Sequence, residues 1–183
     1  MPGKEIKLTD TPAEVVLRDN SGGDGIGGKA TLWRTENAIK VLFCAVDNDI
    51  ISYGKKYNEP LWKGDTVEIF LTLGRRNRYL ELEVNPDGAG YATFVENRNG
   101  EFELEFIDEP PFKWEARRTE YGYECSFEIP FSTLKAIGFD ENEAYFNLYM
   151  QDYTADGLRL YAMAPTMRGS FHRPEAFVKL AVE

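Results

Sequence analysis

The amino-acid sequence predicts an all-β protein, an antiparallel β-sandwich with about ten strands and one short helix. The first observation is a recurrent alternation of apolar and polar residues, seen most clearly in residues 67–73. The second is the turn chemistry of segments such as Asn-Pro-Asp-Gly and Asn-Gly, which accept the positive φ of tight hairpins. The third is that only residues 132–139 resemble a helix, which we expect to be capped by Ser132 and to end at Gly138.

The strand-like segments follow one another along the chain with short connections, as consecutive antiparallel strands do. They occupy residues 14–18, 30–34, 39–46, 67–73, 78–84, 91–97, 101–107, 121–130, 144–153, 158–165 and 175–182. Trp33 and Trp114 lie inside strand patterns, so we expect both indoles to pack in the core. Cys44 and Cys125 also fall in strand patterns and are expected to be reduced thiols.

Length and charge limit the classes of protein and partner. At 183 residues, without a Pro/Gly/Ser-rich linker, residues 1–183 are expected to form a single domain. A net charge of −10 argues against nucleic acid and against an anionic membrane as partners. The N-terminus carries no apolar signal segment, so the sequence as it stands predicts a cytoplasmic protein, or a secreted one if a signal peptide has been removed.

The outward positions of the predicted strands carry an unusual set of side chains. They are Glu68, Tyr79, Glu81, Glu83, Tyr145, Asn147, Tyr149 and Gln151. Carboxylates, amides and tyrosines can hydrogen-bond a polyhydroxylated ligand while their rings pack on its C–H faces. The alternative is a solvated sheet face with ordinary cross-strand pairs.

Catalytic and metal-binding patterns are weak. With 31 acidic residues some pair of carboxylates always fits a hydrolase geometry, and the only histidine is His172, so we expect no enzymatic activity. The loops Val-Asp-Asn-Asp, with Asp47 and Asp49, and Arg-Asp-Asn-Ser-Gly-Gly-Asp-Gly are rich in oxygen ligands. The second loop lacks the acidic twelfth position of an EF-hand, which here is Ala30. A structural calcium ion at Asp47 and Asp49 remains open, and no other cofactor is expected.

Three motifs occur in a recognisable order. They are Trp-x-x-Asp-x-Val-Glu at residues 62–68, Tyr-x-Glu-x-x-Val-Asn at 79–85 and Phe-His-x-Pro-Glu-x-Phe at 171–177. In order and spacing, residues 35–182 resemble the carbohydrate-binding module family 9-like domains. The resemblance implies a β-sandwich of the superfamily that also contains heme-binding DOMON domains, with a mono- or oligosaccharide as partner.

The resemblance also implies site residues. Trp62 would stack on a sugar ring, and Glu68 would accept hydrogen bonds from its hydroxyls. Further contacts would come from Glu83, Asn147, Tyr149, Phe171 and His172. The chain departs from the family pattern at Met150, where relatives often carry a basic residue, and at Met163 and Ala164, where they often carry a second aromatic ring.

The leading hypothesis is therefore non-catalytic carbohydrate binding by stacking on Trp62 and hydrogen bonds from polar residues of the strand face. One alternative is a degenerate structural or interaction domain of a larger assembly, with Trp62 as a lid over the sandwich end. A second is heme binding with His172 and Met150, Met163 or Met167 as axial ligands.

Overall fold

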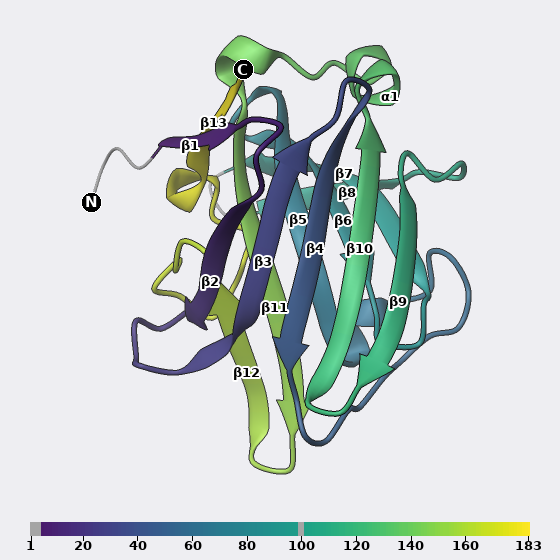
Figure 1. Ribbon diagram of the computed structural model, residues 1–183, viewed down its shortest axis with the longest axis vertical. Coiled ribbons are helices and arrows are strands. Elements are labelled where there is room, and N and C mark those ends of the chain that lie inside the picture. The colour runs from purple at the N-terminus through teal and green to yellow at the C-terminus, as the bar shows by residue number, and fades with distance from the viewer. Residues whose placement is uncertain (1–4, 99–100) are drawn as a thin grey trace.

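The computed structural model describes residues 5–98 and 101–183, and these fold into two packed antiparallel sheets (Figure 1). The first sheet contains, in spatial order, β2 (Ala13–Asp19), β3 (Ile26–Arg34), β4 (Ala38–Val46), β10 (Gly122–Pro130) and β9 (Lys113–Thr119). The second contains β12 (Gly157–Ala162), β11 (Tyr145–Thr154), β5 (Thr66–Arg75), β6 (Arg78–Val84), β7 (Gly90–Arg98) and β8 (Glu101–Phe106). In Figure 1 the first sheet faces the viewer and strands β5 to β8 lie behind it.

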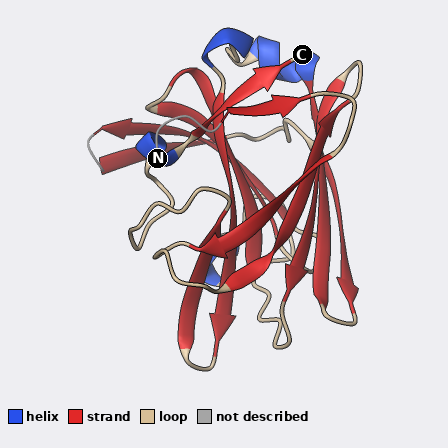
Figure 2. Cartoon of the chain, turned by 60° about the vertical axis from the view of Figure 1, so that its left-hand side comes forward, coloured by secondary structure: helices blue, strands red, loops and turns tan. Residues whose placement is uncertain are grey.

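Two further pairings join the layers. β2 pairs with β12 over only two residue positions, so the two sheets are hydrogen-bonded along one side and open along the other. β1 (Glu5–Leu8) runs parallel to β13 (Val178–Val182), which also pairs with β11. Helical segments are confined to connections between strands (Figure 2). They are η1 (Leu61–Lys63), α1 (Phe131–Ala136), η2 (Glu141–Glu143) and η3 (Pro174–Ala176).

The predicted antiparallel sandwich is confirmed, with 13 strands in the described residues in place of about ten. Strands β1 and β9 lie outside the segments that alternation predicts. β1 has only four residues, and β9, Lys-Trp-Glu-Ala-Arg-Arg-Thr, is mostly charged because it is an edge strand that faces solvent.

The predicted core rows are confirmed as well. Apolar side chains of both sheets meet between the layers and lie within 5% exposure. They include Leu32, Val41, Phe43, Val67, Ile69, Leu71, Leu80, Leu82, Cys125, Phe127, Leu148 and Met150. Cys125 is a buried free thiol and Cys44 a half-buried one.

Two local expectations need correction, and a third is confirmed. Ser132 lies inside α1, whose N-cap is Pro130 with no side-chain hydrogen bond, because the chain leaves β10 directly into the helix. Trp33 is half-buried and lies outside the core. Successive residues of a strand point to opposite faces, and in β3 it is the preceding Leu32 that faces the other sheet. Trp114 does pack against the core, stacked on Phe112 with ring centroids 4.7 Å apart.

The outer face of the second sheet is buried, and this positions the site. Every residue from Thr66 to Leu73 in β5 is buried, including those on the outward side. The chain between β12 and β13 covers this face with Phe171 and Phe177, which pack on Phe70 and Tyr79. The alternative of a solvated sheet face does not hold for this part of the sheet, because a segment distant in sequence folds over it.

Candidate functional site

Three carboxylates lie side by side on the outer face of the second sheet. Glu68 of β5 is directly opposite Glu83 of β6, and Glu81 is two residues earlier on the same side of β6. One carboxylate oxygen from each lies within 4.8 Å of those of the other two. Their exposed fractions are 4%, 1% and 5% for Glu68, Glu83 and Glu81. We refer to these three residues as the carboxylate floor.

Burial raises the pKa of every member of the carboxylate floor, because a charged carboxylate loses its hydration there. The pKa of Glu68 rises to about 8 through burial and the neighbouring charge of Glu81, against the lowering effect of a 3.1 Å hydrogen bond from Thr66 Oγ1. The pKa of Glu81 rises to about 7 through burial. The pKa of Glu83 is raised well above its usual range by burial and by Glu68 and Glu81. Near neutral pH the floor therefore holds protons that ordinary glutamates have lost.

Polar atoms of the floor lack partners within the described residues. Glu81 Oε2 and Glu83 Oε2 are buried without a hydrogen bond, and so is the hydroxyl of Tyr91. Tyr91 of β7 is the cross-strand neighbour of Glu83 and is itself fully buried. Buried polar atoms without partners are rare in folded proteins, so three in one place indicate a site that takes a polar ligand.

Aromatic rings surround the carboxylate floor. Trp62 of η1 is 39% exposed and meets the ring of Tyr91 edge to face, with centroids 5.4 Å apart. Phe106 of β8 also meets the ring of Tyr91, with centroids 5.9 Å apart, and is 53% exposed. Phe102, also on β8 and 43% exposed, stacks on His172 at 4.0 Å. Trp62, Phe102, Phe106 and His172 form what we call the aromatic rim.

His172 links the rim to the floor. Its Nδ1 shares a 2.8 Å hydrogen bond with the hydroxyl of Tyr79, and its Nε2 lies 3.9 Å from Glu81 Oε2. Burial lowers the pKa of His172 to about 4, so the ring is neutral at neutral pH. It therefore contributes a flat surface and a hydrogen bond but no charge to neutralise Glu81.

The structure thus divides the seven sequence-predicted site residues into two groups. Trp62, Glu68, Glu83 and His172 converge on the floor and rim. The remaining three are buried and bonded internally. Asn147 bonds the backbone of Ala164 at 2.8 and 3.0 Å, and Tyr149 donates to Phe171 O at 3.1 Å while its ring stacks on Phe171 at 4.2 Å. These three anchor the segment that carries His172.

Sequence reasoning missed several participants. Glu81 belongs to the predicted polar face but is not among the predicted site residues, and neither is Tyr91 of β7, the cross-strand partner of Glu83. Phe102 and Phe106 read as the apolar side of an ordinary strand, yet they stand exposed beside the floor. The signal that could have found Tyr91 is the hairpin between β6 and β7, whose register places it opposite Glu83.

A second carboxylate cluster lies at the end of the core. Asp47, Asp65 and Asp152 bring one oxygen each within 4.8 Å of one another. Burial raises the pKa of Asp65 to about 7, against hydrogen bonds from the backbone N–H groups of Tyr153 and Ile51. Asp47 Oδ2 and Asp152 Oδ1 are buried without partners in the described chain. This cluster differs from the calcium pair Asp47 and Asp49 expected from the sequence, because Asp49 is not part of it. Asp49 is exposed, and its backbone N–H donates a hydrogen bond to Asp47 Oδ1 at 2.8 Å.

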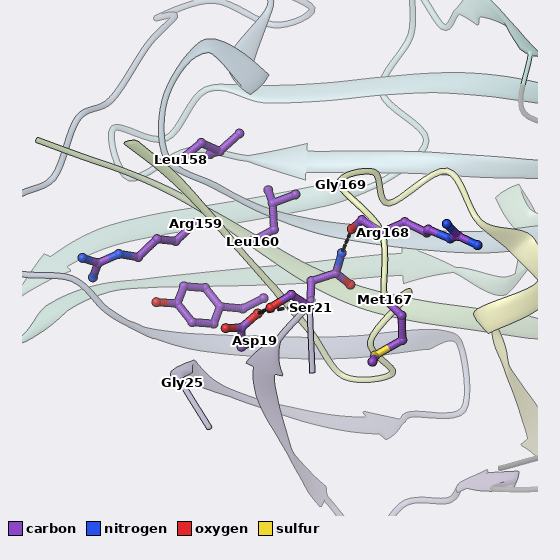
Figure 3. A pocket seen from close by; sticks show the side chains of 11 residues that line it. Asp19, Ser21, Gly25, Leu158, Arg159, Leu160, Met167, Arg168 and Gly169 are labelled. Atoms are coloured by element: carbon purple, nitrogen blue, oxygen red, sulfur yellow. Dashed lines mark hydrogen bonds between the residues drawn. The ribbon is translucent and has the colours of Figure 1, made fainter. Parts of the chain in front are cut away.

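A wider concavity of about 640 Å³ lies where β2 and β12 separate (Figure 3). Its lining includes Asp19, Ser21, Leu158, Leu160 and Met167. Asp19 accepts hydrogen bonds from the Ser21 hydroxyl and backbone N–H, and both lower the pKa of this carboxyl. Its ionised side chain is thus satisfied by its own turn, in contrast to the carboxylate floor.

The heme alternative finds no support in this arrangement. Met150 points into the core between the sheets, whereas His172 lies on the opposite, outer face of the same sheet. Met163 is partly buried and packs against the core, and Met167 is 62% exposed in the loop at the wider concavity. One heme iron cannot bind both His172 and Met150, because the second sheet lies between the two side chains.

Comparison with known proteins rests on structure. No family model matches the sequence, and no curated protein shows significant sequence similarity. A protein from Bacteroides uniformis to which carbohydrate binding is ascribed superimposes with a TM-score of 0.76 at 13% identity, over 99% of this chain and 100% of the other. A family 9 carbohydrate-binding module from Caldicellulosiruptor kristjanssonii in complex with cellotriose gives 0.69 at 16% identity, over 98% and 94%. The chain has the fold of a family 9 carbohydrate-binding module.

The same family 9 module in complex with glucose gives a TM-score of 0.66 at 17% identity, over 98% of this chain and 96% of the other. Because the match extends over almost the whole of both chains, the resemblance read from the three sequence motifs is confirmed at the level of the fold. No helix in the described residues is long and apolar enough to span a membrane.

Proposed function

We propose that this chain binds a mono- or oligosaccharide without catalysing a reaction, at the carboxylate floor and aromatic rim. The observation that carries the proposal is Trp62, a 39% exposed indole held edge-on against Tyr91 beside buried carboxylates that lack partners. Flat rings that pack on sugar C–H faces, next to acceptors for hydroxyl groups, are what a sugar ring needs. The two solved complexes of the same fold, with cellotriose and with glucose, support this choice.

Each group has a distinct role in the proposal. Trp62 and Phe106 offer exposed rings next to Tyr91, while Glu68 and Glu83 of the floor accept hydrogen bonds from the sugar. His172 closes the site from the segment between β12 and β13. Asn147, Tyr149 and Phe171 hold that segment in place and are positioning residues.

Binding is favoured over hydrolysis by the placement of the carboxyls. A glycosidase places two carboxyl groups on either side of the scissile bond. The three carboxyls of the floor all project from one face of one sheet, on two adjacent strands. A sugar that lies on the rim can be held by them but not flanked by them.

Isothermal titration with glucose, xylose, cellobiose and cellotriose tests the proposal. We expect saturable binding to at least one sugar with a dissociation constant in the micromolar to millimolar range, since one or two ring stacks and a few hydrogen bonds supply about 4–8 kcal/mol. No binding across the panel, by a protein whose circular dichroism shows a folded β-structure, would favour the degenerate interaction domain instead.

We further propose that Asp47, Asp65 and Asp152 hold a structural divalent cation, with calcium preferred. Calcium takes oxygen ligands only, and this cluster supplies three carboxylates, two of which have buried oxygens without a partner. The hydroxyl of Tyr123, fully buried and also without a partner, adds a nearby oxygen. Thermal unfolding in calcium and in chelator, followed on the wild type and on Asp152→Asn, tests this assignment.

A further inference from the structure

No cationic side chain of the described residues 5–98 and 101–183 forms an ion pair that would balance the carboxylate floor at neutral pH. Elsewhere on this chain some glutamates are paired with lysines, as the half-buried Glu128 is with Lys40 and Lys113. Within the described residues, no lysine or arginine forms an ion pair with Glu68, Glu81 or Glu83. Among the residues that the structure describes, the basic side chain that lies beside them is His172, which is neutral at neutral pH. Buried acids without a counter-charge are costly, so a site that keeps three of them gains most from a cationic ligand.

The number of unpartnered oxygens indicates how many hydrogen-bond donors the ligand group at the floor should carry. Glu81 Oε2, Glu83 Oε2 and the Tyr91 hydroxyl are three buried oxygens on two adjacent strands, and none has a hydrogen-bond partner in the described chain. An ammonium group presents three N–H donors and no acceptor. A neutral hydroxyl presents one donor, so the ligand could supply only one of these three oxygens with a hydrogen bond.

The aromatic rings around the floor also favour a positively charged ligand. Trp62 and Phe106 both meet Tyr91, and Phe102 stacks on His172 above Glu81. Aromatic faces attract cations through their quadrupole, most strongly when the cation is desolvated. The net charge of −10 would further draw a cation toward the chain.

We propose that the preferred ligand of this site is an amino sugar with a free ammonium group, such as glucosamine or a deacetylated chitosan oligosaccharide. The inference rests on the proposed function, because it keeps the sugar ring on the aromatic rim and changes only the group that meets the floor. The ammonium binds where Glu81, Glu83 and Tyr91 converge. The carboxyl protons held by the floor leave as the ammonium enters, since a bound cation stabilises the charged carboxylates.

Three sugars that differ only at one carbon test the inference. Glucose, glucosamine and N-acetylglucosamine carry a hydroxyl, an ammonium and an acetamide at the same position. By isothermal titration at about pH 6.5, below the ordinary pKa of an amine, we expect glucosamine to bind about tenfold more tightly than glucose, since a charge-assisted hydrogen bond is stronger than a neutral one. N-acetylglucosamine should bind no better than glucose.

Proton release gives a second and independent readout. Titrations in buffers of different ionisation enthalpy should show that glucosamine releases protons on binding and that glucose does not. Glu83→Gln, which keeps the shape of the side chain, should lower the ratio of glucosamine to glucose affinity at least about fivefold. Glu103→Gln removes the same charge from an exposed position on β8 and should leave the ratio unchanged.

The outcomes separate the two proposals. If no sugar binds, the proposed function itself fails. If glucose binds as tightly as glucosamine, or if glucosamine binds without proton release, the carbohydrate site stands and the preference for a cationic sugar is refuted. Tight binding of calcium at the floor, lost in Glu83→Gln and competing with glucosamine, would assign the floor to a metal ion instead. Glu81→Gln provides a second test if Glu83→Gln does not fold.

Discussion

Replacing Trp62 by alanine isolates the contribution of ring stacking to binding. A tryptophan side chain presents up to about 250 Å² of surface, so the 39% that is exposed leaves about 100 Å² for a ligand. A sugar that covers one face would bury about half of that area. At about 25 cal/mol per Å² this is about 1.2 kcal/mol, or close to a tenfold loss of affinity for every sugar that binds.

The surrounding loop should survive the change. The backbone carbonyl of Trp62 accepts hydrogen bonds from Gln151 Nε2 at 2.7 Å and from the Tyr153 hydroxyl at 3.0 Å, and alanine keeps both. The edge contact with Tyr91 is lost, which costs about 0.5–1.5 kcal/mol of folding stability in addition to the buried area. Binding and stability are therefore expected to respond separately.

The assay is isothermal titration with the tightest-binding sugar, together with a thermal unfolding scan. Trp33→Ala is the matched control, because it deletes a half-buried indole from the first sheet, away from the floor. We expect Trp62→Ala to weaken binding about tenfold and Trp33→Ala to leave it unchanged. Equal affinity of wild type and Trp62→Ala, with both folded, would show that Trp62 is a lid on the sandwich and that the stacking argument is wrong.

Three further predictions follow from buried polar groups. Without ligand, the free energy of unfolding should fall as the pH rises from about 4.5 to about 8, because the raised pKa values of Glu68 (about 8) and Glu81 (about 7) make the folded state bind more protons than the unfolded chain. In urea unfolding, Glu81→Gln should show a weaker pH dependence across this window. A rise in stability with pH would contradict the raised pKa values. Calcium at about one hundred times its dissociation constant should stabilise the wild type by about 2.7 kcal/mol, as measured by calorimetry. Asp152→Asn should abolish this gain, because it removes one of the three carboxylates of the cluster. An equal gain in the variant would mean that calcium binds elsewhere. Asn147→Ala should lower the free energy of unfolding by about 2–4 kcal/mol in denaturant, because the backbone N–H and C=O of Ala164 lose their hydrogen-bond partner. A loss below about 1 kcal/mol would mean that water replaces the amide.

The amino-acid sequence alone determined the fold class and the core. Alternation in segments such as 67–73 fixed which side chains face the opposite sheet, because successive residues of a strand point to opposite faces. Local turn chemistry then predicted hairpins, and Gly138, with φ of 95°, follows the short helix as expected. Trp62 and Glu68 could be singled out because one short motif contains both.

The tertiary structure alone decided what the outer face of the second sheet does. The alternation that placed Glu68 and Glu83 outward could not show that both are buried, or that Phe171 and Phe177, about a hundred residues later in the chain, cover part of the same face. Strand register brought Tyr91 opposite Glu83, and sheet topology joined Asp47 to Asp152. Such neighbours depend on pairings between distant segments, which no local periodicity encodes. The charge and unsatisfied oxygens of the site emerge only once those pairings are made.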